Sequence, residues 1–159
     1  MHRTLTRLAL LALISFGCGG PSVSCPEPGL PDPDPSYTDS IASLVVVPAR
    51  AELREASAAE KASFADLVAT YQAACDASPP TSECAMTPLR AALVALPAPD
   101  HPALFTDIDG SLDAALTRAH DDFAPADRDC DGQPEETCDA RGVTRAFARA
   151  SCELSEGGH

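Results

Sequence analysis

The segment DRDCDGQPEETCD, from Asp127 to Asp139, concentrates the side chains of this chain that could do chemistry. Its first half places aspartates at every second position before a glycine. Alternate carboxylates in a tight turn can converge on one point, and glycine permits the sharp bend that such a turn needs. Hard divalent cations such as Ca²⁺ take about six to eight oxygen ligands, so cation binding is the first chemistry that this spacing indicates.

The DRDCDG portion resembles the calcium loops of EF-hands and dockerin-like modules. The resemblance implies that the ligand oxygens come from Asp127, Asp129, Asp131, Gln133, Glu135 and Glu136. The second half departs from the family pattern, because Cys138 stands where a bidentate glutamate is expected and Pro134 occupies the eighth position. Glu136 can replace that glutamate only if the loop follows a different path.

The competing interpretation is an acidic turn that holds no metal. Cys130 and Cys138 then form structural disulfides, and the acids that follow lie in the first turn of a helix. Carboxylates there, such as Glu135, Glu136 and Asp139, interact favourably with the helix dipole. Both interpretations stay open, and a calcium-binding module is the alternative function of the chain.

The start of the chain, MHRTLTRLALLALISFGCGG, has two arginines, an apolar run and small residues around Cys18. This is the pattern of a secretory signal, and its apolar run is too short to span a bilayer. Around GCGG the sequence resembles a bacterial lipoprotein signal, although Ser15 replaces the usual aliphatic residue. The resemblance implies a lipid on Cys18 and, because Gly19 follows it in place of aspartate, a place at the outer membrane. Ordinary cleavage to a secreted soluble protein is the alternative.

The seven cysteines indicate disulfide bonds in an oxidising compartment. With Cys18 given to the lipid, six remain for three bridges: Cys25, Cys75, Cys84, Cys130, Cys138 and Cys152. Cys75 and Cys84 flank a short turn, so a bridge between them is expected to clamp a helical hairpin. The other four share two bridges, one of which is expected to tie the N-terminal segment to the C-terminal region.

The chain is strongly acidic, with a formal net charge of −13. Nucleic acid is excluded as a partner by this balance, because binding to phosphates requires a basic patch. The same balance disfavours adsorption to anionic lipid headgroups and is compatible with cation binding. The expected contact with a membrane is therefore the N-terminal lipid anchor.

Four regions are expected along the chain. Residues 1–17 form the signal peptide, 18–40 the lipidated cysteine and a proline-rich tether, 41–155 a helical domain, and 156–159 a tail. Proline fixes φ and removes an amide donor, so the tether is expected to be extended and semi-rigid.

Apolar residues at spacings of three and four predict an all-α domain, a small disulfide-stapled bundle of about four helices. The first helix is expected from Pro48 to the SPP sequence at 78–80, with Glu60 as the polar residue on its apolar stripe. The run IASLVVVP at 41–48 is interpreted as an apolar lead-in that packs on the helices.

The other three helices are expected further along the chain. Thr87 is expected to be the N-cap of the second helix, with Pro88 just inside it. The third is expected to begin near Thr106, and the fourth to run from about Asp139 to Leu154.

No complete catalytic motif occurs: HExxH, CxxC, GxSxG and glycine-rich phosphate loops are all missing from the sequence. His120 beside Asp121 and Asp122 could form a metal cluster, but a histidine at a helix C-terminus is more often a partner of the dipole. The sequence thus predicts a non-enzymatic lipoprotein of the cell envelope, a binding or structural module without a cofactor unless calcium binds. Another envelope protein is a candidate partner.

Overall fold

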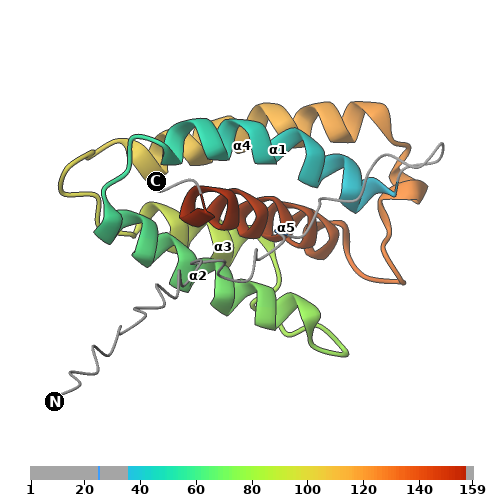
Figure 1. Cartoon of the computed structure of the whole chain (residues 1–159). Coiled ribbons are helices and arrows are strands. Elements are labelled where there is room, and N and C mark those ends of the chain that lie inside the picture. The colour runs from blue at the N-terminus through green and yellow to red at the C-terminus, as the bar shows by residue number, and fades with distance from the viewer. Residues whose placement is uncertain (1–24, 26–35, 157–159) are drawn as a thin grey trace, which may run out of the picture.

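The computed structural model describes Cys25 and residues 36–156. These residues form five α-helices and a short 3₁₀ helix: α1 (Tyr37–Leu53), α2 (Ala58–Asp76), α3 (Met86–Val94), α4 (Leu104–Asp122), η1 (Pro125–Arg128) and α5 (Glu135–Glu156). The prediction of an all-α fold is confirmed. Figure 1 shows α5 in the middle of the bundle, with α1 and α4 on one side and α2 and α3 on the other. The predicted signal peptide, Cys18 and most of the predicted tether lie outside the described residues.

Helix α1 contains the run that the sequence suggested was an apolar lead-in, so that interpretation and the helix start at Pro48 are wrong. The helix begins at Tyr37, Ser36 caps it by accepting from the amide of Asp39 at 3.3 Å, and Pro48 lies inside it. One stripe of its buried side chains recurs every fourth residue, at Tyr37, Ile41, Val45, Ala49 and Leu53. This stripe faces the core, and its packing outweighs the weak helix propensity of the valines.

The single long helix expected from Pro48 is also wrong, because the chain breaks between Leu53 and Ala58. Ser57 begins α2 with a capping box: its hydroxyl accepts from the Glu60 amide at 3.3 Å, and the Glu60 carboxylate accepts from the Ser57 amide at 2.7 Å. The polar residue on the predicted stripe is therefore the residue that starts a new helix.

The third and fourth elements also begin differently from the prediction. Helix α3 begins at Met86 after Ala85, so Thr87 lies inside the helix and is not its N-cap. Helix α4 begins at Leu104, two residues before the predicted start near Thr106, and Ala103 provides no side-chain cap.

Helix α5 begins at Glu135, about one turn before the predicted start near Asp139. It packs against α1, α2 and α3. A methyl group added at Gly142 would lie 2.6 Å from the Ile41 Cβ and 2.9 Å from the Thr38 carbonyl oxygen, closer than atoms can pack. Glycine at this position therefore permits the close crossing of α1 and α5.

Three disulfides staple the bundle, and they pair all six cysteines of the described residues: Cys25–Cys152, Cys75–Cys84 and Cys130–Cys138. The Cys75–Cys84 bridge is the one predicted to clamp a helical hairpin, which α2 and α3 form here. The Cys25–Cys152 bridge is the predicted connection between the N-terminal segment and the C-terminal region. The Cys25 carbonyl also accepts a hydrogen bond from Arg149 of α5 at 2.9 Å, which holds the bridged residue against that helix.

Candidate functional site

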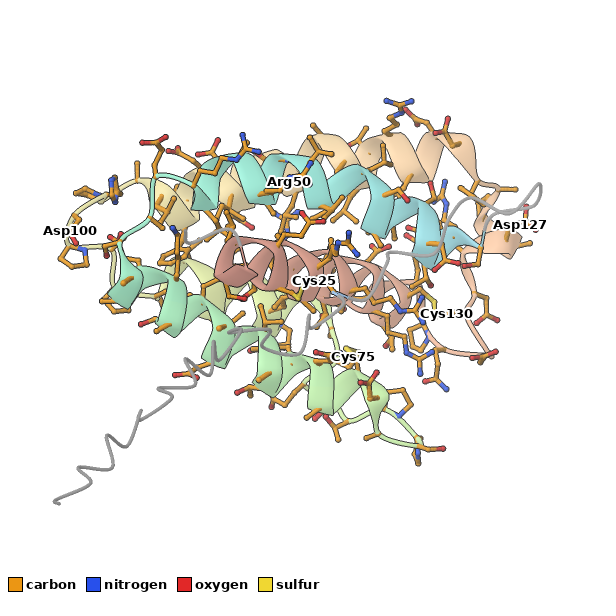
Figure 2. All side chains as sticks on the ribbon, in the orientation of Figure 1. Cys25, Arg50, Cys75, Asp100, Asp127 and Cys130 are labelled. Atoms are coloured by element: carbon orange, nitrogen blue, oxygen red, sulfur yellow. A yellow bond between two sulfur atoms is a disulfide. The ribbon has the colours of Figure 1, made fainter. Side chains whose placement is uncertain are left out.

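The aspartates of the predicted calcium loop lie on the exposed turn between α4 and α5. Asp127 belongs to η1, Asp129 follows it, and Asp131 has a positive φ of 58°, as does Gly132 at 74°. The Asp131 side chain is 93% exposed and lies 3.8 Å from the Arg141 guanidinium. Figure 2 shows Asp127 and Cys130 at this end of the molecule.

The two glutamates of the predicted loop point to different partners. Glu136 accepts from the backbone amide of Thr87 at 2.7 Å, and this hydrogen bond lowers the pKa of its carboxyl. Glu136 thus provides the cap that α3 lacks in its own sequence. Glu135 instead faces His120 and Arg128. The structure therefore separates these two glutamates, and calcium binding by the loop stays a prediction.

A different trio lies together where α4 ends and α5 begins. The Nε2 atom of His120 is 3.3 Å from Asp139 Oδ2 and 3.6 Å from Glu135 Oε1. In the described part of the chain, this is the one group of three histidine, cysteine or acidic side chains whose ligand atoms all lie within 4.8 Å of one another. We call His120, Glu135 and Asp139 the junction cluster. The neighbours Asp121 and Asp122, which the sequence suggested as partners of His120, are exposed and do not belong to it.

Two further side chains hold the carboxylates of the junction cluster. The Tyr37 hydroxyl of α1 donates to Asp139 Oδ1, and Arg128 Nη1 lies 3.3 Å from Glu135 Oε2. Arg128 also donates to the carbonyl oxygens of His120 and Phe123, which are among the last acceptors of α4. Its guanidinium thus caps α4 and orients Glu135 at the same time.

Burial sets the electrostatics of the junction cluster. Burial raises the pKa of Asp139, and the hydrogen bond from Tyr37 and the nearby His120 oppose that rise without cancelling it. Burial also raises the pKa of Tyr37, and the hydrogen bond to Asp139 acts in the same direction. The phenol therefore stays protonated and serves as a hydrogen-bond donor to the carboxylate.

A second histidine contact lies at the other end of the bundle, where Figure 2 labels Asp100. The buried Glu60 carboxylate accepts from the amides of Asp100 and His101, both at 3.2 Å, and lies 2.9 Å from His101 Nδ1. With the bond from Ser57, this carboxylate joins the start of α2 to the loop between α3 and α4. Burial alone would raise the pKa of Glu60, but these hydrogen bonds outweigh it and lower the pKa to about 2.

Sequence reasoning missed the junction cluster and the role of Glu60 for different reasons. Glu135 and Asp139 stand four residues apart, the spacing of one helix face, and a helix start at 135 would have paired them. Ser57 and Glu60 form the S-x-x-E signature of a helix start. No local signal connects Tyr37 with Asp139, which are 102 residues apart.

Comparisons with protein-family models, with curated proteins and with solved structures find no match for this chain. None of the helices in the described ranges has the length and apolar character needed to cross a bilayer.

Proposed function

We propose that this chain is a non-enzymatic lipoprotein of the cell envelope, a helical binding or structural module held at a membrane by a lipid on Cys18. The observation that carries the proposal is the Cys25–Cys152 disulfide. It joins the segment just after the lipoprotein-like signal to the last helix. Such a bridge persists in an oxidising compartment outside the cytosol.

The cysteine pairing also supports the role proposed for Cys18. Six of the seven cysteines pair with one another in the structure. No cysteine of the chain is then left over to pair with Cys18, so the residue that the signal resemblance marks for the lipid is also the one that the disulfide framework does not use.

The bridge at Cys25 shortens the tether that the sequence suggested. A lipid on Cys18 would be linked to the bundle through the seven residues up to Cys25, which reach at most about 25 Å when fully extended. The proline-rich stretch after Cys25 then lies inside a loop closed by the disulfide and does not lengthen the link. In this proposal the short segment from Cys18 to Cys25 holds the bundle close to the membrane surface, and α5 is the helix to which that segment is attached.

The lipid is tested by the intact mass of the processed protein and by membrane fractionation. The expected mature chain begins at Cys18 and carries added acyl mass, and Cys18→Ser is expected to move the protein to the soluble fraction. A mature chain that begins after Cys18, or one without acyl mass, would contradict the proposal and favour a secreted soluble protein.

The short tether is tested by inserting a protease site between Gly29 and Leu30. Cleavage at this site is expected to leave the bundle on membranes until a reductant opens the Cys25–Cys152 bridge. The Cys25→Ser/Cys152→Ser variant with the same insertion is the matched control, and it is expected to release the bundle without reductant. Release of the wild-type bundle by protease alone would show that the disulfide does not carry the attachment.

A further inference from the structure

We propose that the junction cluster is a binding site for a divalent transition-metal ion of the zinc class, with His120, Glu135 and Asp139 as its ligands. The site is distinct from the predicted calcium loop, of which it uses only Glu135. It is also independent of the lipid proposed above, because all three ligands belong to the helical bundle.

The spacings from His120 to the two carboxylates match a metal site. Zinc is bound at about 2.0–2.2 Å by histidine nitrogen and carboxylate oxygen, so neighbouring ligand atoms in a tetrahedron lie about 3.3–3.6 Å apart. The His120 Nε2 distances to Asp139 and Glu135 are 3.3 Å and 3.6 Å. The ligand atoms of Glu135 and Asp139 lie within 4.8 Å of each other, so a side-chain adjustment that brings them closer would let all three atoms share one ion.

In each of the two carboxylates, one oxygen contacts an outer partner and the other faces His120, as in the carboxylate ligands of metal sites. Asp139 Oδ1 accepts from Tyr37, which leaves Oδ2 to face His120. Glu135 Oε2 faces Arg128, which leaves Oε1 toward His120. In metal sites an outer partner likewise holds one oxygen of a carboxylate and orients the other toward the ion.

Exposure at the cluster leaves a route for the ion and room for a fourth ligand. The Asp139 side chain is only 9% exposed, whereas His120 and Glu135 are 33% and 42% exposed. One side of the cluster therefore faces solvent, where a water molecule can complete a four-coordinate site. The histidine ligand favours zinc-like ions over calcium and magnesium, which prefer oxygen ligands alone.

A bound ion would join three elements. His120 belongs to the last turn of α4, Glu135 and Asp139 to the first two turns of α5, and Tyr37 connects Asp139 to the start of α1. An ion that binds the folded chain and not the unfolded chain raises the melting temperature as its concentration rises.

Zinc binding is tested by calorimetric titration of ZnCl₂ into the chelator-treated mature protein with its disulfides formed. One ion per chain is expected, with a melting temperature that rises with Zn²⁺ concentration. His120→Gln and Glu135→Gln are each expected to weaken binding by more than about tenfold, the effect that even outer-shell substitutions can have. Circular dichroism verifies that each variant keeps its helical content.

Matched controls separate this site from adventitious binding. Glu136→Gln changes a neighbouring carboxylate that faces α3, and His101→Gln changes the histidine at the other end of the bundle, so both are expected to keep wild-type zinc affinity. Co²⁺ provides a second readout, because its visible absorption reports tetrahedral coordination and is expected to be lost in His120→Gln. Equal affinities in wild type, His120→Gln and Glu135→Gln, or equal losses in the controls, would overturn the proposal.

Discussion

The two histidine and carboxylate contacts of this bundle differ in what surrounds the carboxylate. Glu60 is enclosed by donors, since the amides of Ser57, Asp100 and His101 all bind it, in addition to the His101 ring. The junction cluster instead gathers two carboxylates around a single histidine.

The pKa values of the two buried carboxyls move in opposite directions. Several hydrogen-bond donors lower the pKa of Glu60 to about 2 despite its burial. At Asp139 the effect of burial is the larger one, and it raises the pKa. A carboxylate whose oxygens all accept hydrogen bonds from the protein connects the segments that donate to it. Carboxylates with oxygens directed at a shared point can bind a cation. Similar residue types thus have different roles because of the number of donors around them.

Glu60→Gln is expected to produce the largest loss of stability among the single substitutions considered. The amide cannot accept all the hydrogen bonds that the carboxylate accepts, so buried donors lose their partner. Thermal unfolding followed by circular dichroism measures the effect, and Glu55→Gln, an exposed acid just before α2, is the control. A fall in melting temperature no larger than that of the control would show that the Glu60 contacts are not structural.

Acid pH is expected to reveal the same contacts in the wild-type protein. The pKa of Glu60 is about 2 in the folded state against an ordinary value of 4.5, so its ionised form stabilises the fold. This contribution is fully present above pH 4.5 and is lost as the pH falls toward about 2. Chemical unfolding across this range measures it, and Glu60→Gln is expected to show a weaker pH dependence. Parallel curves for the two proteins would contradict the prediction.

Two disulfides of similar loop length allow the junction to be compared with the rest of the fold. Cys130–Cys138 and Cys75–Cys84 span sequence separations of 8 and 9 residues. Replacing either pair by serine is expected to lower the free energy of unfolding by about 2.5 kcal/mol on the chain-entropy estimate. Only loss of the first pair is expected to weaken zinc binding as well, because that bridge orders the turn before Glu135. Equal zinc affinities in both double variants would contradict the distinction.

Glu136→Gln is expected to lower the free energy of unfolding by at most about 1 kcal/mol, the range of a lost exposed helix cap. The carboxylate binds the Thr87 amide, and a neutral amide oxygen is a weaker acceptor for it. Urea unfolding measures the change. A simultaneous loss of zinc affinity would place Glu136 in the metal site, contrary to its orientation.

Asp131→Asn is expected to have the smallest effect, within about 0.5 kcal/mol, as for most exposed substitutions. The side chain is 93% exposed, so its replacement leaves packing unchanged. Calcium titrations of the wild type and this variant test the loop that the sequence suggested. Wild-type calcium binding that Asp131→Asn abolishes would support that loop, which shares Glu135 with the proposed zinc site.

The parts of the fold that sequence predicted well were those with strong local signals. Cys75 and Cys84 flank a short proline-containing turn, and proximity in sequence predicted their bridge. The predicted helix boundaries were wrong where tertiary packing outweighed helix propensity. The valines at 45–47 are helical because the stripe from Tyr37 to Leu53 is buried, and the local preference of valine does not indicate a helix there.

The residues of the junction cluster were singled out from the sequence separately and not as a group. Glu135 was assigned to the predicted calcium loop, and His120 was paired with Asp121 and Asp122. Their contact could not be predicted, because the choice between Glu135 and Glu136 depends on the exact start of α5 and on the position of α3. A shift of one residue rotates a helical side chain by about 100°, which is enough to send one glutamate to His120 and the next to Thr87.

The sequence by itself determined the all-α class, the acidic character and the Cys75–Cys84 bridge, since periodicity, composition and the short spacing of two cysteines are local properties of the chain. The pairing of the other four cysteines was left open by the sequence and decided by the structure. Tertiary structure alone decided which carboxylates meet which donors. Tyr37 reaches Asp139, and Glu60 reaches the loop at Asp100, only because packing brings distant segments together. The number of hydrogen-bond donors around each carboxylate then determines whether it connects segments of the fold or is a candidate metal ligand.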